Sequence, residues 1–197
     1  MKKYNQVLIL YHIAERELVL SDIMADCVRE GQLAEDIVVA EMYSTIENIY
    51  DYKPDLIICP TPRDEYSSQL FSLVKYIFKC AIVSIPTEQY MDMSDETMHR
   101  LIGLNAQPIG LVDRYLFWGP KIAERAGSEL LKYNKISSID RIGIFGYLLY
   151  ERERVMKYYR YGEISSRIYE LQKIYSKTVM FVTAIMDYSP SIDDIIA

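Results

Sequence analysis

Short apolar runs alternate with longer helix-like segments along most of the chain, and this alternation is the feature that most constrains the fold. Each run is four or five residues long, and a polar residue, a glycine or a proline follows within two positions. Such runs are typical of buried strands, which are shorter than buried helices and end at turn residues. The runs occupy residues 7–10, 37–40, 56–59, 81–85, 114–118 and 141–144.

Segments with helical spacing separate these runs. Helices are predicted to end at Gly31, at Tyr52 before a Lys-Pro pair, near Phe78 and near Lys132. Strands that alternate with helices at this spacing predict a Rossmann-like α/β fold: an open, mostly parallel sheet of about six strands with helices on both faces. Residues 87–112 form a long connection between two of the strands.

The predicted domain covers residues 1–150, and a different pattern follows it. Residues 151–176 have helical character and suggest a linker, while residues 177–197 contain a strong strand at 178–184. That strand is either the first strand of a second, mostly absent domain or an edge strand of the same sheet. The sequence favours neither alternative.

Composition excludes several classes of protein. The 197 residues are 50% hydrophobic, enough for a large core, and the net charge of −6 disfavours a nucleic-acid partner, whose phosphates require basic patches. The three cysteines lack the spacing of a metal site and are expected to be reduced core thiols of a cytoplasmic protein. No signal peptide and no apolar stretch of about 20 residues is present, so we expect a soluble protein that can still dock on a membrane.

The familiar nucleotide and catalytic motifs are missing from the sequence. There is no GxGxxG after a strand, no GxxxxGK[ST], no GxSxG and no HExxH. Dinucleotide-dependent oxidoreductases, P-loop proteins and serine hydrolases are therefore disfavoured, and no metal is expected.

Polar residues instead follow the predicted strands, at positions where an open parallel sheet binds its ligands. Hydroxyl, carboxylate and amide groups can bind sugar hydroxyls, and arginine can hold a phosphate or carboxylate through paired donors. The candidates are His12, Glu15, Arg16 and Glu17 after the first strand, Thr61 and Arg63 after the third, Thr87, Glu88 and Gln89 after the fourth, Trp118 and Gly119 after the fifth, and Gly146 after the sixth.

Each candidate also has a structural interpretation. Glu15 and Glu17 open a helix, where the helix dipole favours carboxylates, and His12 is equally well a structural histidine. Trp118 at a strand end is more often part of a core than a ligand platform. His99, in a helix-like part of the long connection, is expected to be exposed.

Four short motifs resemble the N-terminal half of bacterial surface carbohydrate (polysaccharide) biosynthesis proteins, which are related to glycosyltransferases of the GT-B fold. The motifs are "ERELV" from Glu15, "SIPTEQ" from Ser84, "VDRYLFWGP" from Val112 and "IDRIGIFGYLLYERER" from Ile139. The last motif departs from the family pattern, because Gly146 is followed by Tyr-Leu-Leu where the family has Asn and Arg.

The resemblance implies an acceptor-binding half of a metal-independent transferase. The nucleotide-sugar donor would bind a C-terminal domain, and the partners would be a sugar or glycan acceptor and a nucleotide-sugar, with peripheral membrane association at the inner face of the membrane. Glu15, Glu88 or His12 would act as catalytic base, and Arg16 would steer a phosphate or an acidic sugar.

Two alternatives to the transferase stay open. One is a non-catalytic module that binds a sugar or a nucleotide, or that forms a subunit of a two-part transferase. The other is a domain like those of sugar-nucleotide epimerases. The sequence leaves the sugar, the linkage and the oligomeric state undetermined.

Overall fold

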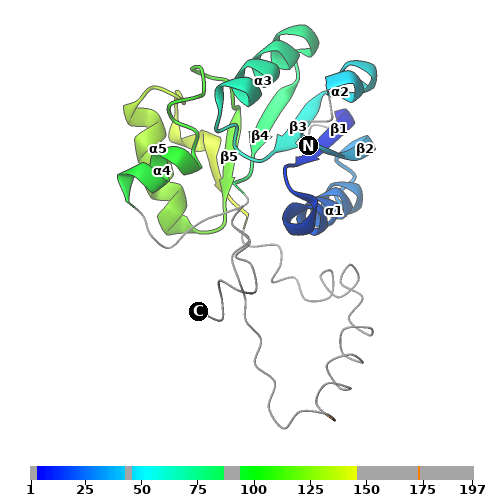
Figure 1. Cartoon of the computed structure of the whole chain (residues 1–197), viewed down its shortest axis with the longest axis horizontal. Helices are drawn as coiled ribbons and strands as arrows, with labels where there is room; N and C mark the ends of the chain where they lie inside the picture. Colours follow the sequence, from blue (N-terminus) through cyan, green and yellow to red (C-terminus); the bar gives the residue numbers. More distant parts are fainter. Residues whose placement is uncertain (1–3, 43–45, 87–93, 146–172, 174–197) are drawn as a thin grey trace, which may run out of the picture. The chain divides into compact units, whose positions relative to one another are not determined.

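The computed structural model describes residues 4–42, 46–86, 94–145 and residue 173 (Figure 1). The chain divides into two units, residues 1–158 and 159–197, and all the helices and strands given below lie in the first. The predicted linker and the predicted strand at 178–184 fall outside the described residues, apart from residue 173, and stay predictions.

The described elements follow the predicted alternation. The strands are β1 (Tyr4–Tyr11), β2 (Ala34–Glu41), β3 (Leu56–Cys59), β4 (Ala81–Ser84), β5 (Arg114–Phe117) and β6 (Ile142–Ile144). The helices are α1 (Ala14–Glu30), α2 (Ile46–Tyr52), α3 (Glu65–Phe78), α4 (Asp95–Leu101) and α5 (Pro120–Lys132), with a short 3-10 helix at Ile139–Arg141.

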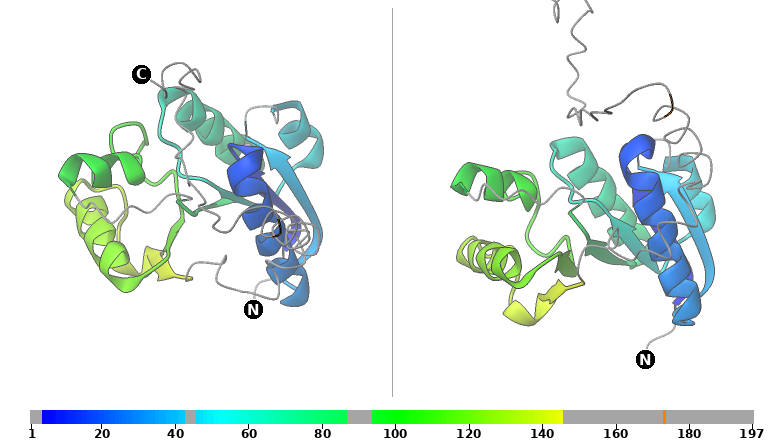
Figure 2. Two further views of the ribbon diagram at one scale, coloured as in Figure 1. Left: turned by 60° about the horizontal axis from the view of Figure 1, so that its bottom comes forward. Right: turned by 90° about the horizontal axis from the view of Figure 1, so that it is seen from below.

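All six described strands run parallel in one open sheet, which confirms the predicted Rossmann-like α/β fold. Their order is β2-β1-β3-β4-β5-β6, so β2 and β6 form the two edges (Figure 2). After β2 the chain returns past β1 to form β3, and the direction of strand addition reverses between β1 and β3. In open α/β sheets, the carboxyl side of such a reversal is where ligands bind.

Helices cover both faces of the sheet, as expected for a parallel sheet whose central strands are apolar throughout. Side chains alternate along β1: Val7 and Ile9 pack in one core with α1, whereas Leu8 and Leu10 pack in the other with α2, α3, α4 and α5. Figure 1 shows α1 on the side of the sheet opposite to α2 and α3.

The helix ends agree with the signals in the sequence. The Gly31 N–H closes α1 by donating to the Cys27 carbonyl at 3.0 Å. At the start of α3, the Asp64 carboxylate accepts from the Ser67 N–H at 2.7 Å and so caps one of the four amide groups that lack a partner in the helix. The Asp64 cap fixes where the loop at the carboxyl end of β3 ends and α3 begins.

Within the connection at residues 87–112, the helix-like part predicted around His99 forms α4. Met98 and Leu101 are buried, and this apolar side of the short helix holds it against the core. The expectation that His99 is exposed is wrong: its side chain is 24% exposed, and Nε2 lies 2.8 Å from Glu129 Oε2 on α5. Docking of α4 on α5 brings the imidazole to that carboxylate.

None of the helices within the described residues combines the length and the apolar character needed to cross a bilayer.

Candidate functional site

The strand order brings two predicted clusters together at the carboxyl ends of neighbouring strands, which we call the candidate edge. His12 follows β1, and Thr61 and Arg63 follow β3, which pairs with β1. The carboxyl ends of parallel neighbours lie side by side, so these residues flank the reversal point. Trp118 and Gly119 follow β5, two strands further along the sheet.

Glu17 organises the turn between β1 and α1. Its side chain is 1% exposed, and Oε2 accepts from the His12 N–H at 2.6 Å and from the Ile13 N–H at 3.4 Å. Both amides lie just before α1, and the Glu17 side chain reaches back to them from the first turn, much as the glutamate of a capping box reaches the N-cap N–H. This geometry agrees with the structural interpretation of Glu17. A role in binding substrate stays a prediction.

Thr61 is buried at the carboxyl end of β3. Its Oγ1 is 2.9 Å from Ser84 Oγ at the end of β4, and both side chains are buried. One hydroxyl donates to the other, and this hydrogen bond joins the carboxyl ends of two neighbouring strands. A direct contact between Thr61 and a substrate likewise stays a prediction.

Arg63 lines an open hollow between the β3–α3 loop and α4. The hollow has a volume of about 710 Å³, and its other arginine, Arg100, comes from α4. Charged side chains of both signs surround it, together with the amide of Asn105. The lining residues are Arg63, Asp64, Glu65, Glu96, His99, Arg100, Gly103, Asn105 and Ala106.

Sequence reasoning missed the α4 side of this hollow. Glu96, Arg100 and Asn105 are more than thirty residues from Arg63 in sequence, and none directly follows a strand. The spacing of Met98 and Leu101 was the signal available, because it marks a helix that has to dock on the core.

The backbone at Gly103 packs closely against the backbone at Pro62, and this contact holds the two walls of the hollow together. Gly103 has φ +61°, and a Cβ on it would overlap the Pro62 carbonyl oxygen, so a side chain has no room there. Gln107 Nε2 donates to the carbonyls of Pro62 and Ile102, both at 3.0 Å, and its Oε1 accepts from the Tyr115 hydroxyl at 2.6 Å. The loop that carries Arg63 is therefore anchored to both α4 and β5.

Trp118 and Gly119 are half-buried between β5 and α5. Gly119 is the N-cap residue of α5, and Pro120 occupies the first helical position, where its missing N–H costs nothing. A Cβ at Gly119 would meet no atom within 4 Å. A small side chain could therefore be accommodated at this position.

Several predicted site residues cannot be placed. Thr87, Glu88, Gln89 and Gly146 lie outside the described residues, and for Glu15 and Arg16 only the backbone is described, in the first turn of α1. Their proposed roles stay predictions.

Cys59 and Cys80 are buried thiols outside any disulfide. Burial raises the pKa of the Cys80 thiol to about 11, and burial also raises the pKa of Cys59, so both are protonated at neutral pH. They are apolar parts of the core, as predicted, whereas Cys27 on α1, which was also predicted to be a core thiol, is only half-buried. Within the part of the chain that the structure describes, no three His, Cys, Asp or Glu side chains are grouped as metal ligands would be.

Comparison with known proteins gives a weak structural likeness. No family model and no curated protein matches the chain. Among solved structures, it is similar to Anabaena Alr3699/HepE, crystallised in complex with UDP and glucose, with a TM-score of 0.40 and 10% sequence identity. The match covers 72% of this chain and 44% of that one, so the chain spans less than half of the solved protein. The Rossmann-like fold of this chain follows from its own strand order and pairing.

Proposed function

We propose that this chain is the acceptor-side half of a GT-B glycosyltransferase-like protein of bacterial surface polysaccharide biosynthesis. The open parallel sheet and the sequence motifs support this proposal, and one observation carries it. The Glu17 carboxylate accepts from the His12 and Ile13 N–H groups just before α1, and so places a buried negative charge in the first βα turn, close to where nucleotide-binding sheets hold a phosphate.

The occupied turn bears directly on the choice of ligand. A phosphate there would meet a buried carboxylate within hydrogen-bond distance of the same amides, and like charges at that separation repel strongly. Nucleotide binding at this turn is therefore disfavoured, and side chains take over recognition. That is the arrangement expected of the half that holds the sugar acceptor while the nucleotide-sugar binds elsewhere.

The hollow beside Arg63 fits an acceptor with several hydroxyl groups. Arginine and asparagine supply donors and the glutamates supply acceptors, so a sugar can exchange its bonds to water for bonds to the protein. Its walls are fixed by the Gly103 contact and the Gln107 bonds, which reduces the entropy lost on binding.

The chemistry proposed is direct displacement at the anomeric carbon of the donor. A base within hydrogen-bond reach takes the proton of the acceptor hydroxyl, and Glu15, Glu88 and His12 are the candidates. Arg16 would steer a phosphate or an acidic sugar, and no metal takes part. The protein would work in the cytoplasm, associated peripherally with the inner face of the membrane.

Binding measurements with the 197-residue chain test the acceptor role. We expect binding to members of an array of bacterial surface oligosaccharides and no measurable binding of free UDP. Arg63→Ala should weaken glycan binding by about tenfold or more, as expected for the loss of a charged hydrogen bond. Arg114→Ala is the matched control, because Arg114 is exposed at the amino end of β5, on the opposite edge of the sheet.

Tight UDP binding without glycan binding would contradict the acceptor role and favour a nucleotide-binding module. Glycan binding that Arg63→Ala and Arg114→Ala weaken equally would place the site elsewhere. Catalytic roles need a preparation that transfers sugar, in which Glu15→Gln and Glu88→Gln should each lower turnover by about a hundredfold if the residue is the base. Unchanged turnover in both variants would rule out these two carboxylates and leave His12 to be tested.

A further inference from the structure

His99 and Glu129 form a hydrogen-bonded pair at one side of the hollow. His99 of α4 is among the residues that line the hollow, whereas Glu129 of α5 is not. His99 Nε2 lies 2.8 Å from Glu129 Oε2, and the two side chains are only 24% and 16% exposed. The imidazole therefore connects the lining of the hollow to a carboxylate outside it.

Contacts with α5 hold the His99 ring in place. The Tyr133 ring packs edge to face against the imidazole, with centroids 5.5 Å apart. Asp95, one turn before His99 on α4, forms an ion pair with Arg125 of α5, and the joined atoms are 2.7 Å apart. This second polar link between the same two helices restrains α4. The two nitrogens of the imidazole therefore keep distinct surroundings.

The Glu129 carboxylate determines which ring nitrogen of His99 carries the proton. The hydrogen bond from His99 lowers the pKa of the Glu129 carboxyl, so the carboxylate is ionised at neutral pH and can only accept. The proton of the neutral ring is therefore on Nε2, and Nδ1 keeps a lone pair. Among the described residues, no group donates a hydrogen bond to Nδ1. The ring thus has an acceptor atom left for a ligand.

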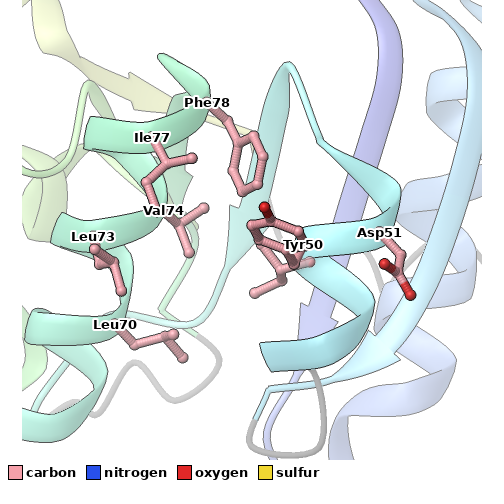
Figure 3. A pocket seen from close by; sticks show the side chains of 8 residues that line it. Tyr50, Asp51, Leu70, Leu73, Val74, Ile77 and Phe78 are labelled. Carbon is pink, nitrogen blue, oxygen red and sulfur yellow. The ribbon is translucent and has the colours of Figure 1, made fainter.

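A groove between α2 and α3 offers a contrast to the hollow (Figure 3). Its volume is about 430 Å³, and among the described residues that line it only Tyr50 and Asp51 are polar. A sugar needs donors and acceptors for several hydroxyl groups, so it should prefer the hollow beside His99. The groove supplies Leu73 as a position for a control variant.

We infer that His99 is a ligand-binding residue of the hollow, in which Nδ1 accepts a hydrogen bond from a hydroxyl group of the sugar acceptor. Glu129 is the positioning residue, because it holds the imidazole in the tautomer that leaves Nδ1 without a proton. The inference rests on the proposed function, since it assigns one contact within the acceptor site.

Two substitutions of His99 separate ligand binding from the contact with Glu129. In His99→Gln, the side-chain amide N–H takes the place of Nε2–H and keeps the bond to Glu129, but no acceptor atom stands at the position of Nδ1. In His99→Asn, the side-chain carbonyl oxygen takes the place of Nδ1, and the bond to Glu129 is lost. A purely structural histidine would be replaced better by glutamine, and a ligand-binding one by asparagine.

Isothermal titration calorimetry of the 197-residue chain measures binding of the glycan with the highest affinity in an array of bacterial surface oligosaccharides. His99→Gln should weaken binding about tenfold, whereas His99→Asn should stay within about threefold of the wild type. Urea denaturation should rank the two variants in the opposite order, with His99→Gln the more stable. Leu73→Ala, in the α2–α3 groove, is the control and should change binding less than about twofold.

Nitrogen-15 NMR of the histidine-labelled chain tests the tautomer at about pH 8, where a histidine side chain is ordinarily neutral. The chain has two histidines, so the spectrum of His99→Gln identifies the His99 signals. We expect the proton on Nε2, and a proton on Nδ1 would overturn the inference.

Glycan binding that His99→Gln leaves unchanged, or that His99→Asn weakens more than His99→Gln does, would also overturn the role of His99. Either of these results would leave the acceptor function of the hollow intact. A wild-type chain that binds no glycan in the array would overturn both the proposed function and the inference.

Discussion

Two residues restrain the backbone of the loops at the candidate site. The Glu17 carboxylate fixes the β1–α1 turn through the His12 and Ile13 N–H groups, and Gly103 lets the loop after α4 touch the Pro62 carbonyl. Substitution of either residue should destabilise the protein. Glu17 is a buried hydrogen-bond acceptor, and Gly103 has no space for a Cβ atom. Both positions therefore make measurable predictions.

Glu17→Ala is expected to lower the free energy of unfolding by about 2–3 kcal/mol, because it leaves two N–H groups of the turn without their charged acceptor. Glu17→Gln keeps an acceptor oxygen and should cost about half as much. Urea denaturation measures both, and Glu124→Ala on the exposed side of α5 should cost less than about 0.5 kcal/mol. Equal losses for Glu17→Ala and Glu124→Ala would contradict the structural role of Glu17.

Glycine-to-alanine variants separate steric clash from backbone strain. Gly103→Ala combines a positive φ with a Cβ that overlaps the Pro62 oxygen and should cost about 3 kcal/mol or more. Gly110→Ala has φ +72° but open space, so only strain of about 1–2 kcal/mol is expected. Gly119→Ala has neither problem and should change stability by under about 1 kcal/mol. Thermal unfolding should rank the three variants in this order.

At the scale of elements, the strands were predictable and the contacts between loops were not. The apolar runs at 56–59 and 81–85 match β3 and β4 closely, because buried parallel strands have a strong local pattern. The hollow beside Arg63 depends on α4, a seven-residue helix, and on Gln107 reaching Pro62 across 45 positions of sequence. Contacts of that range have no local signature in the sequence.

The packing of α4 on α5 predicts a pH dependence. The hydrogen bond from His99 lowers the pKa of the Glu129 carboxyl below its usual value, with a further contribution from Lys132. A lowered native pKa means that the unfolded state binds the proton more tightly, so this contribution is complete above the ordinary pKa of glutamate, about 4.3, and is lost as the pH falls through the lowered native value.

Glu129→Gln should therefore be less stable than the wild type at pH 6 to 7, and the difference should shrink as the pH is lowered below about 4. Chemical denaturation at a series of pH values measures it. Glu124→Gln, on the same helix, should show no such dependence. A wild-type advantage that grows on acidification would contradict a lowered pKa of Glu129 in the folded state.

At the scale of the whole molecule, the open parallel sheet could be predicted but its strand order could not. The alternation of strands and helices predicts that the strands are parallel and that the crossover connections are right-handed. Whether β3 then pairs with β1 or with β2 depends on the direction in which the second crossover runs, and here β3 pairs with β1, which leaves β2 at the outside of the sheet. The sequence therefore predicted which loops carry the candidate residues. The structure was needed to show that the strand order reverses between β1 and β3.

The reaction rates of the buried Cys59 and Cys80 thiols can measure how often the sheet opens. Cys59 ends β3 and Cys80 precedes β4, so the two buried thiols lie at opposite ends of the two central strands, and a thiol reagent can reach both only when these strands separate from their neighbours. We expect a reagent such as a disulfide dye to modify Cys59 and Cys80 at one shared rate, which follows the free energy of unfolding across the Gly103→Ala, Gly110→Ala and Gly119→Ala series. Mass spectrometry of the modified peptides measures the two rates. If Cys80 reacts much faster than Cys59, then the centre of the sheet opens in separate steps and the molecule unfolds in parts.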